Sequence, residues 1–242
     1  MSDPPSQSDA SATLTVLDEV PLDQTRRTIA RRLGESYRDA VHVTVSRAID
    51  VGPLLEAKEG LQDREGSLVD IFLLAIADTL DDHPRFNATF EDDTVTLYEE
   101  HNIAIAIDTD AGLLAPVIPD ISSLDVDTLA SKRRELTERV QAGEQSLADL
   151  RGGTITVTNL GPLQIDSFSP IINPPQVAIV GLNRIRKRAV PSDDGDVAFR
   201  PEMTIDVTFD HRVVDGADAA RFLATLAERL NDANKYAPSA HG

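Results

Sequence analysis

The sequence lacks several features that would assign a protein to a common class. Its 242 residues include no cysteine, which excludes disulfide bonds, thiolate metal sites and a cysteine nucleophile. No apolar run approaches the ~18 residues that a membrane-spanning helix needs. Residues 1–12 lack the basic and apolar pattern of a signal peptide. These absences predict a soluble, cytoplasmic protein that does not bind a membrane.

Positive charge is also scarce. Lysine and arginine contribute 23 positive charges and aspartate and glutamate 41 negative ones, so the formal net charge is −18. Such a surface disfavours nucleic acid as a partner because it repels phosphate. Of the acidic residues 28 are aspartate, and only four residues are lysine. Abundant short carboxylates favour a protein of a salt-rich cytoplasm, where ions screen their mutual repulsion. An ordinary acidic protein is the alternative.

Motifs for several reactions are missing. The chain has no G-x-x-x-x-G-K-[ST] loop, no G-x-G-x-x-G after a strand and no G-x-S-x-G elbow. Nucleotide hydrolysis and serine hydrolysis are therefore disfavoured. The five histidines are scattered and never form a paired ligand motif, so the sequence predicts no metal site.

Apolar and polar residues alternate in patterns that predict one mixed domain over residues 18–234. Helical spacing or capping signals mark residues 23–37, 68–80, 125–142, 146–149 and 217–230. Strand patterns mark residues 42–51, 86–90, 94–98, 102–108, 114–119, 154–158, 177–181 and 203–209. Because helix and strand signals alternate along the chain, the sequence predicts an α/β two-layer sandwich with a mixed β-sheet. We expect a disordered lead-in over residues 1–17 and a flexible tail over residues 235–242.

The helix predicted from Asp23 carries an unusual charge for this acidic chain. Arg26, Arg27, Arg31 and Arg32 crowd it. These arginines either offset neighbouring acidic residues or lie beside an anionic ligand. The sequence leaves both interpretations open.

Residues 210–216, Asp-His-Arg-Val-Val-Asp-Gly, stand where an alternating strand gives way to a helix. An imidazole at a strand end can be half buried and neutral, which suits a general base. Asp215, four residues after His211, can orient the imidazole or fix the loop, directly or through an arginine. The alternative is a histidine packed as structure beside an aspartate that caps the helix.

Several segments in a fixed order carry a family resemblance. The last ninety residues contain Gly-Gly-Thr-Ile-Thr-Val-Thr-Asn-Leu-Gly at 152–161, Ile-Ile-Asn-Pro-Pro-Gln-Val-Ala-Ile at 171–179 and the segment 210–216. The upstream segments are Arg26-x-x-Ile29-Ala30-x-x-Leu33-x-x-Ser36, His42-Val43-Thr44, Phe86-Asn87-Ala88 and Asp108-Thr109-x-x-Gly112-Leu113-x-x-Pro116-Val117. Over residues 18–232 the chain thus resembles the catalytic domain of dihydrolipoamide acyltransferases, the core components of 2-oxo-acid dehydrogenase complexes.

The resemblance implies a coenzyme A-dependent acyltransferase fold, shared with chloramphenicol acetyltransferase, and reversible acyl transfer between a dihydrolipoyl thiol and coenzyme A. No metal is implied. In this family the histidine matching His211 takes the thiol proton, and the hydroxyl matching Thr158 donates a hydrogen bond to the tetrahedral oxyanion. The aspartate matching Asp215 keeps the site in register. We expect the residues that bind coenzyme A to include Asn159, Arg26 and Ser36.

The resemblance also implies partners and an assembly. Family members usually carry lipoyl and subunit-binding domains, for which the lead-in is too short, and no lysine precedes Lys58. We therefore expect neither domain here and a lipoyl group supplied in trans by a lipoyl carrier, with other 2-oxo-acid dehydrogenase components as further partners. The chain is then either an excised catalytic domain or a stand-alone acyltransferase. Family catalytic domains form trimers with the site between subunits. Tyr236 is the only large apolar side chain in residues 231–242, so we expect a homotrimer that builds no larger core.

Two rival functions are compatible with the same residues. A coenzyme A-dependent acetyltransferase that acts on a small non-lipoyl acceptor would keep the fold and His211. An inactive core subunit that only organises partners would not need His211, Asp215 and Thr158 together. The acyl group is open among acetyl, succinyl and branched acyl.

Overall fold

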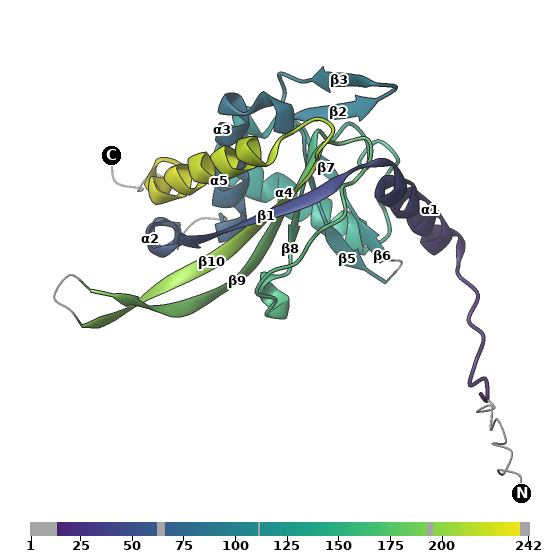
Figure 1. Cartoon of the computed structure of the whole chain (residues 1–242), viewed down its shortest axis with the longest axis horizontal. Helices are drawn as coiled ribbons and strands as arrows, with labels where there is room; N and C mark the ends of the chain where they lie inside the picture. The colour runs from purple at the N-terminus through teal and green to yellow at the C-terminus, as the bar shows by residue number, and fades with distance from the viewer. Residues whose placement is uncertain (1–13, 62–65, 111, 193–195, 238–242) are drawn as a thin grey trace, which may run out of the picture.

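A six-stranded mixed sheet forms the centre of the protein, with the strand order β1-β10-β9-β8-β4-β7 (Figure 1). The computed structural model describes residues 14–61, 66–110, 112–192 and 196–237. Strand β8 runs parallel to both of its neighbours, and the other pairs in this sheet are antiparallel. The six strands are β1 (His42–Asp50), β4 (Ile103–Ile105), β7 (Val117–Ile118), β8 (Ile155–Asn159), β9 (Ala178–Pro191) and β10 (Val197–Asp210). The prediction of a mixed sheet is confirmed.

Helices cover one face of this sheet. The described α-helices are α1 (Gln24–Asp39), α2 (Gly52–Glu59), α3 (Leu68–Asp82), α4 (Val126–Gln141) and α5 (Gly216–Asn231). Helix α1 is not part of this layer, since Ser36 is its only buried residue. Helices α3 and α5 lie side by side, and α5 packs on β1 and β10 (Figure 1). Every second residue of β10 enters the core, from Met203 to Phe209, because side chains alternate between the faces of a strand. None of the described helices is long and apolar enough to cross a bilayer.

The opposite face of the sheet is polar although it is buried. Part of the segment between β8 and β9 covers it, since Ser167 and Phe168 both donate hydrogen bonds to Asp206. Thr44 and Thr208 hydroxyls bond to each other across β1 and β10. The buried polar residues of β8 and β10 on this face are Thr156, Thr158, Asp206, Thr208 and Asp210. The predicted site residue Thr158 therefore lies on a polar face rather than in the apolar core.

Side-chain capping contacts begin three of the helices. Asp23 accepts a hydrogen bond from the Arg26 amide at the start of α1, and Asp125 accepts one from the Thr128 amide at the start of α4. A capping box of Ser67 and Asp70 starts α3. The buried Asp70 carboxylate also accepts two hydrogen bonds from Arg133 of α4, which ties the two helices together.

Other predicted elements need correction. The strand predicted at 177–181 is much too short, because β9 continues to Pro191 by pairing with β10. The strands predicted at 102–108 and 114–119 are each divided, since the chain leaves the sheet to form a separate hairpin of β5 (Ile107–Thr109) and β6 (Gly112–Leu114). Helix α2 is not predicted. The capping contacts between Ser146 and Asp149 form, but only a turn follows them. The predicted hairpin at 86–98 is confirmed as β2 (Ala88–Glu91) and β3 (Thr94–Leu97).

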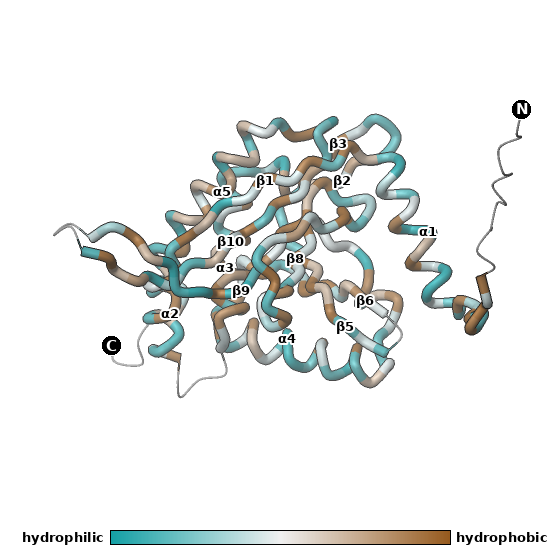
Figure 2. The backbone as a smooth tube through the Cα atoms, turned by 60° about the horizontal axis from the view of Figure 1, so that its bottom comes forward, coloured by the Kyte–Doolittle hydropathy of each residue, from teal (hydrophilic) through white to brown (hydrophobic). Residues whose placement is uncertain are grey.

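The two ends of the described chain differ. Residues 14–23 run as an extended segment beyond α1, and Figure 2 shows the hydrophobic character of this part of the tube. Its exposed apolar side chains are Leu14, Val16, Leu17, Val20 and Leu22. At the other end Lys235 and Tyr236, predicted to be part of a flexible tail, are both hydrogen-bonded to Asp78 of α3. The packed domain thus extends to Ala237, and the rest of the predicted tail and residues 1–13 of the lead-in lie outside the described residues.

Candidate active site

His211 lies in the turn that joins β10 to α5. Its backbone amide donates a hydrogen bond to the Val41 carbonyl, 2.8 Å away, which fixes the turn against the residue before β1. Its ring packs 5.7 Å from the Phe209 ring, and the side chain is 41% exposed. The imidazole is therefore held on one side and open to a ligand on the other, as a general base must be.

Asp215 stands at the N-cap position of α5, but its side chain makes no capping hydrogen bond. Its Oδ1 atom lies 3.9 Å from Nδ1 of His211. This separation is longer than a hydrogen bond, so the two groups are close but not hydrogen-bonded in this structure. Asp215 accepts the first helical hydrogen bonds through its backbone carbonyl, and its carboxylate is left free beside His211.

The two neighbours of His211 form an ion pair that sequence analysis does not identify. Asp210 is buried, and its carboxylate binds the Arg212 guanidinium with an N–O distance of 2.6 Å. Burial alone would raise the pKa of Asp210, but hydrogen bonds from Arg212 and from the Val41 amide lower it below its ordinary value. The Arg212 guanidinium also lies 4.7 Å from the centre of the Phe90 ring. The only signal in the sequence for this anchor of the turn is an aspartate at the end of an alternating strand with an arginine two residues later.

Thr158 is buried near the end of β8, far from His211 of the same chain. The register pairs Thr158 with Gly181 of β9, and Gly181 with Asp206 of β10. Since His211 lies five residues beyond Asp206 and two strands from β8, about 19 Å separates the two residues. One chain therefore does not bring its own histidine and threonine to one reacting atom.

The predicted coenzyme A residues lie on two elements, α1 and β8. Ser36 of α1 is buried and donates a hydrogen bond of 2.6 Å to the Ile172 carbonyl, which ties α1 to the segment before β9. Asn159 ends β8, and its Oδ1 accepts a hydrogen bond from the Gly161 amide. The Arg26 guanidinium lies over Gly112, where an added Cβ would come within 3.1 Å of it.

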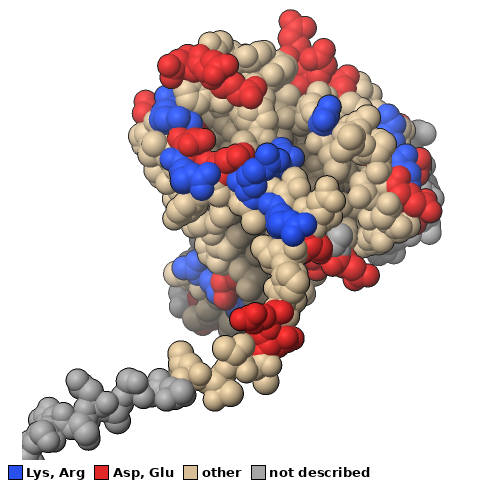
Figure 3. Space-filling view, turned by 90° about the vertical axis from the view of Figure 1, so that its right-hand side faces the viewer, with Lys and Arg blue, Asp and Glu red and all other residues tan. Residues whose placement is uncertain are grey.

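A pocket of about 410 Å³ gathers part of the positive charge of α1. Three arginines, Arg31, Arg32 and Arg151, line it together with one carboxylate, Glu35. Gly152 and Gly153 line it without side chains. We call it the arginine pocket. Figure 3 views this side of the molecule and shows Lys and Arg side chains gathered in the middle of the face, with acidic groups around them. In this acidic chain the pocket suits an anionic ligand.

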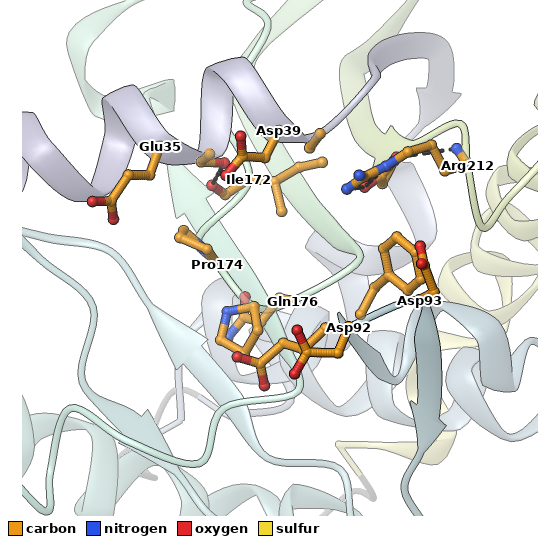
Figure 4. A pocket seen from close by; sticks show the side chains of 14 residues that line it. Glu35, Asp39, Asp92, Asp93, Ile172, Pro174, Gln176 and Arg212 are labelled. Carbon is orange, nitrogen blue, oxygen red and sulfur yellow. Dashed lines mark hydrogen bonds and ion pairs between the residues drawn. The ribbon is translucent and has the colours of Figure 1, made fainter.

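A second pocket, of about 520 Å³, has the opposite charge. Figure 4 shows Glu35 and Asp39 on one side of it, Asp92 and Asp93 on the other, and Arg212 at one end. We call it the acidic pocket; it shares four lining residues with the arginine pocket. Despite its carboxylates, the described residues include no group of three or more that could hold a metal ion. Its charge disfavours a phosphate ligand.

Comparison with known proteins gives a family for this site. A family model for the catalytic domain of 2-oxoacid dehydrogenase acyltransferases matches residues 16–237. The acetyltransferase component of the Mycobacterium bovis pyruvate dehydrogenase complex is 34% identical over 220 residues, which cover 86% of this chain and 40% of that protein. The succinyltransferase component of the Haemophilus influenzae 2-oxoglutarate dehydrogenase complex is 30% identical, covering 88% and 54%. The chain thus spans about half or less of the length of these relatives.

Solved structures agree in fold. The dihydrolipoamide acetyltransferase of Azotobacter vinelandii, studied for the roles of a serine, a histidine and an asparagine in its catalytic mechanism, aligns with a TM-score of 0.85 and 28% identity. The alignment covers 96% of this chain and 99% of that one. Chloramphenicol acetyltransferase aligns with a TM-score of 0.53 at 16% identity, which shows the likeness in fold alone. By its sequence and its fold, the chain belongs to the family of 2-oxoacid dehydrogenase acyltransferase catalytic domains.

Proposed function

We propose that this protein transfers an acyl group between coenzyme A and a dihydrolipoyl thiol. The observation that carries the proposal is the half-exposed His211 imidazole, held in a turn anchored by Asp210 and Arg212, in a chain of this family. The relatives are named as acetyl- or succinyltransferases that act on a dihydrolipoyllysine residue. An imidazole at this position supplies the base that thiol attack on a thioester requires.

The proposed reaction proceeds by direct transfer. His211 takes the proton of the attacking thiol, whose ordinary pKa of about 8.5 leaves it mostly protonated at neutral pH. The sulfur then attacks the carbonyl carbon of the acyl thioester. The oxyanion that forms accepts a hydrogen bond from the Thr158 hydroxyl. When the carbon–sulfur bond of the leaving thiol breaks, that sulfur takes the proton back from His211. Asp215, whose Oδ1 lies 3.9 Å from Nδ1 of His211, keeps the imidazole in register during this step.

The site closes between two copies of the chain, with His211 from one and Thr158 from the other. The separation of about 19 Å within one chain supports this arrangement, as does the exposed apolar segment 14–22, which a second copy would cover. The Azotobacter enzyme has its serine 52 residues before its histidine and its asparagine four residues after it. Thr158 precedes His211 by 53 residues here and Asp215 follows by four. We infer a homotrimer, the assembly implied by the family resemblance.

Coenzyme A carries several phosphates, and the two pockets differ in their suitability for them. The arginine pocket attracts phosphate, whereas the acidic pocket repels it. We therefore place the phosphate end of coenzyme A on Arg31, Arg32 and Arg151. Direct contacts from Arg26, Ser36 and Asn159 stay predictions, and the hydrogen bonds of Ser36 and Asn159 to the backbone give these two a positioning role.

We also propose the setting of the enzyme. A lipoyl carrier and other 2-oxo-acid dehydrogenase components serve as partners, and the −18 charge suits a salt-rich cytoplasm. Tyr236, the one large apolar side chain of the tail, is hydrogen-bonded to Asp78 and is not free to insert into another trimer. We propose a trimer that builds no larger shell, and this contact of Tyr236 within its own chain supports the proposal. Light scattering at several salt concentrations tests this: a mass near that of three chains supports it, and a much larger particle contradicts it.

The function is tested by acyl transfer itself. The purified chain is given acetyl-, succinyl- or isobutyryl-coenzyme A together with dihydrolipoamide, and acyl-lipoamide formation is measured. A panel of small amines and alcohols replaces dihydrolipoamide in parallel. Transfer to dihydrolipoamide supports the proposal. Transfer only to another acceptor would favour a small-molecule acetyltransferase, and no transfer at all would favour an inactive core subunit.

A further inference from the structure

The neighbours of Thr158 on the polar face lie in one row across three strands. Thr158, Gly181 and Asp206 are register partners on β8, β9 and β10, so all three positions point to the same face. Gly181 has no side chain, so a side chain from another segment can enter the space above it. An acyl group whose carbonyl oxygen is bound by Thr158 would lie beside that side chain.

Phe168 limits this space. A Cβ added to Gly181 would lie 2.9 Å from Cζ and 3.0 Å from Cε1 of Phe168, so the ring rests directly on the glycine backbone. Phe168 is only half-buried, and the rest of its ring is an accessible apolar surface. Neighbouring strands are about 4.8 Å apart, so the ring stands one strand away from Thr158 and borders an acyl group bound by its hydroxyl.

Asp206 fixes the position of this ring. Its buried carboxylate accepts hydrogen bonds from the Phe168 amide at 2.9 Å and from the Ser167 hydroxyl at 3.0 Å. It also accepts from the Ser46 hydroxyl of β1 and from Nδ2 of Asn183 of β9. These donors, all hydroxyl or amide groups, carry no charge that would compensate the carboxylate. Arg184 and Arg186 of β9 are both bound to Asp166.

We propose that Phe168 and Asp206 form an acyl-selecting wall, and that the enzyme uses short, uncharged acyl groups such as acetyl in preference to dicarboxylic ones such as succinyl. The inference rests on the proposed function, since it places the acyl carbonyl at Thr158. A succinyl chain would bring its free carboxylate against an aromatic ring with a buried carboxylate behind it, which is unfavourable by desolvation and by repulsion. Acetyl- and succinyltransferases match this chain at similar identity, so the wall, and not the relatives, indicates the acyl group.

The test compares acetyl-, isobutyryl- and succinyl-coenzyme A as donors to dihydrolipoamide. In the unaltered trimer we expect kcat/KM for acetyl to exceed that for each of the others by about tenfold or more. Phe168→Ala is expected to reduce the preference for acetyl over isobutyryl by about tenfold. Asp206→Asn keeps the shape of the side chain, and we expect it to raise succinyl transfer relative to acetyl while the isobutyryl ratio stays unchanged.

Two further variants keep the test independent of folding. Phe168→Leu retains an apolar side chain of similar size and should give an intermediate preference. Phe199→Ala removes an exposed ring from the outer part of β10 and should leave all ratios unchanged. Equal transfer of acetyl and succinyl by the unaltered enzyme, or an equal loss for every donor in the Phe168 variants, would overturn the wall while the proposed function stands. If no donor supports transfer, the proposed function fails and the wall with it.

Discussion

Asp206 and Asp210 lie four residues apart on the same face of β10, both are buried, and they are held in opposite ways. Asp210 binds a cation, the guanidinium of Arg212, together with two backbone amides. Asp206 binds hydroxyl and amide groups from β1, from β9 and from the segment between β8 and β9. An ion pair holds one turn through strong local contacts, whereas a carboxylate with uncharged donors joins several elements. The first arrangement suits the turn that presents His211, and the second suits the wall beside Thr158.

The largest effect is expected at the Asp210 end of the strand. His211→Ala removes the general base and should lower kcat for acyl transfer by ~10²- to 10⁴-fold, while the melting temperature stays nearly unchanged because the imidazole is partly exposed. Steady-state rates and thermal unfolding of the same preparations measure both. Asp218→Asn, on the surface of α5, serves as the control. A loss of less than tenfold would contradict the assignment of His211 as the base.

Substitution of Thr158 tests the part of the sheet beside Asp206, two strands away in the same row. Thr158→Ala should reduce kcat by an amount equivalent to roughly 2 to 4 kcal/mol with little change in KM, because the hydroxyl acts in the transition state. Thr158→Ser keeps the hydroxyl and should retain most of the activity. An unchanged kcat in the alanine variant would instead assign Thr158 to strand packing.

Removing the cation tests the contrast between the two aspartates directly. Arg212→Met leaves Asp210 buried without its charged partner, and we expect the free energy of unfolding to fall by about 1 to 3 kcal/mol, less than for a fully buried pair because Arg212 is partly exposed. Asp206→Asn removes no cation contact and should cost less, about 1 kcal/mol. Urea unfolding at pH 7 measures both. A larger loss in the Asp206 variant would reverse the comparison.

Acid unfolding sharpens the same contrast. The folded pKa of Asp210 lies below its unfolded value, so its stabilising contribution is complete above about pH 4 and is lost as the pH falls through the folded pKa. Without the guanidinium this lowering is weaker, so Arg212→Met should show a shallower loss of stability between neutral pH and pH 3. Urea unfolding at several pH values in that range measures the slope. A parallel loss in both proteins would show that Arg212 is not responsible.

The smallest effect concerns the whole surface rather than one end of the strand. If the −18 charge is suited to a saline cytoplasm, raising KCl from 0.1 to 2 M should raise the melting temperature by a few degrees, because a Debye length near 3 Å at ~1 M screens carboxylate repulsion. A buried ion pair is screened much less than surface charge. The Arg212→Met variant should therefore show the same rise. A flat or falling melting temperature would contradict the salt-rich setting.

The sequence predicts the parts of this fold that have local causes. Strand β10 is recognisable because its apolar residues alternate, and α3 because a capping box precedes an apolar run. The outer half of β9 is not predicted, because its charged residues are typical of a loop. It is a strand because it pairs with β10, where Glu202 forms an ion pair with Arg188. Helix α2 is short, and its burial through Leu54 and Ala57 is a tertiary effect.

The same limit applies to the site. The motif around His211 is visible in the sequence, and so is the hydroxyl of Thr158. The pairing of Asp210 with Arg212 and the contact of Phe168 with Gly181 depend on side-chain placement that one sequence does not reveal. Above all, the distance between His211 and Thr158 follows from the strand register, which is set by pairing across three strands.

That distance has a consequence for genetics and for mixtures. If each site takes its base from one subunit and its oxyanion donor from another, two inactive variants can restore activity when they assemble together. Co-assembled His211→Ala and Thr158→Ala chains would contain some sites with both groups intact, about a quarter of the total for random mixing of equal amounts. Two inactivating alleles of the same gene would then complement each other. Dilution below the dissociation constant of the trimer would abolish this restored activity.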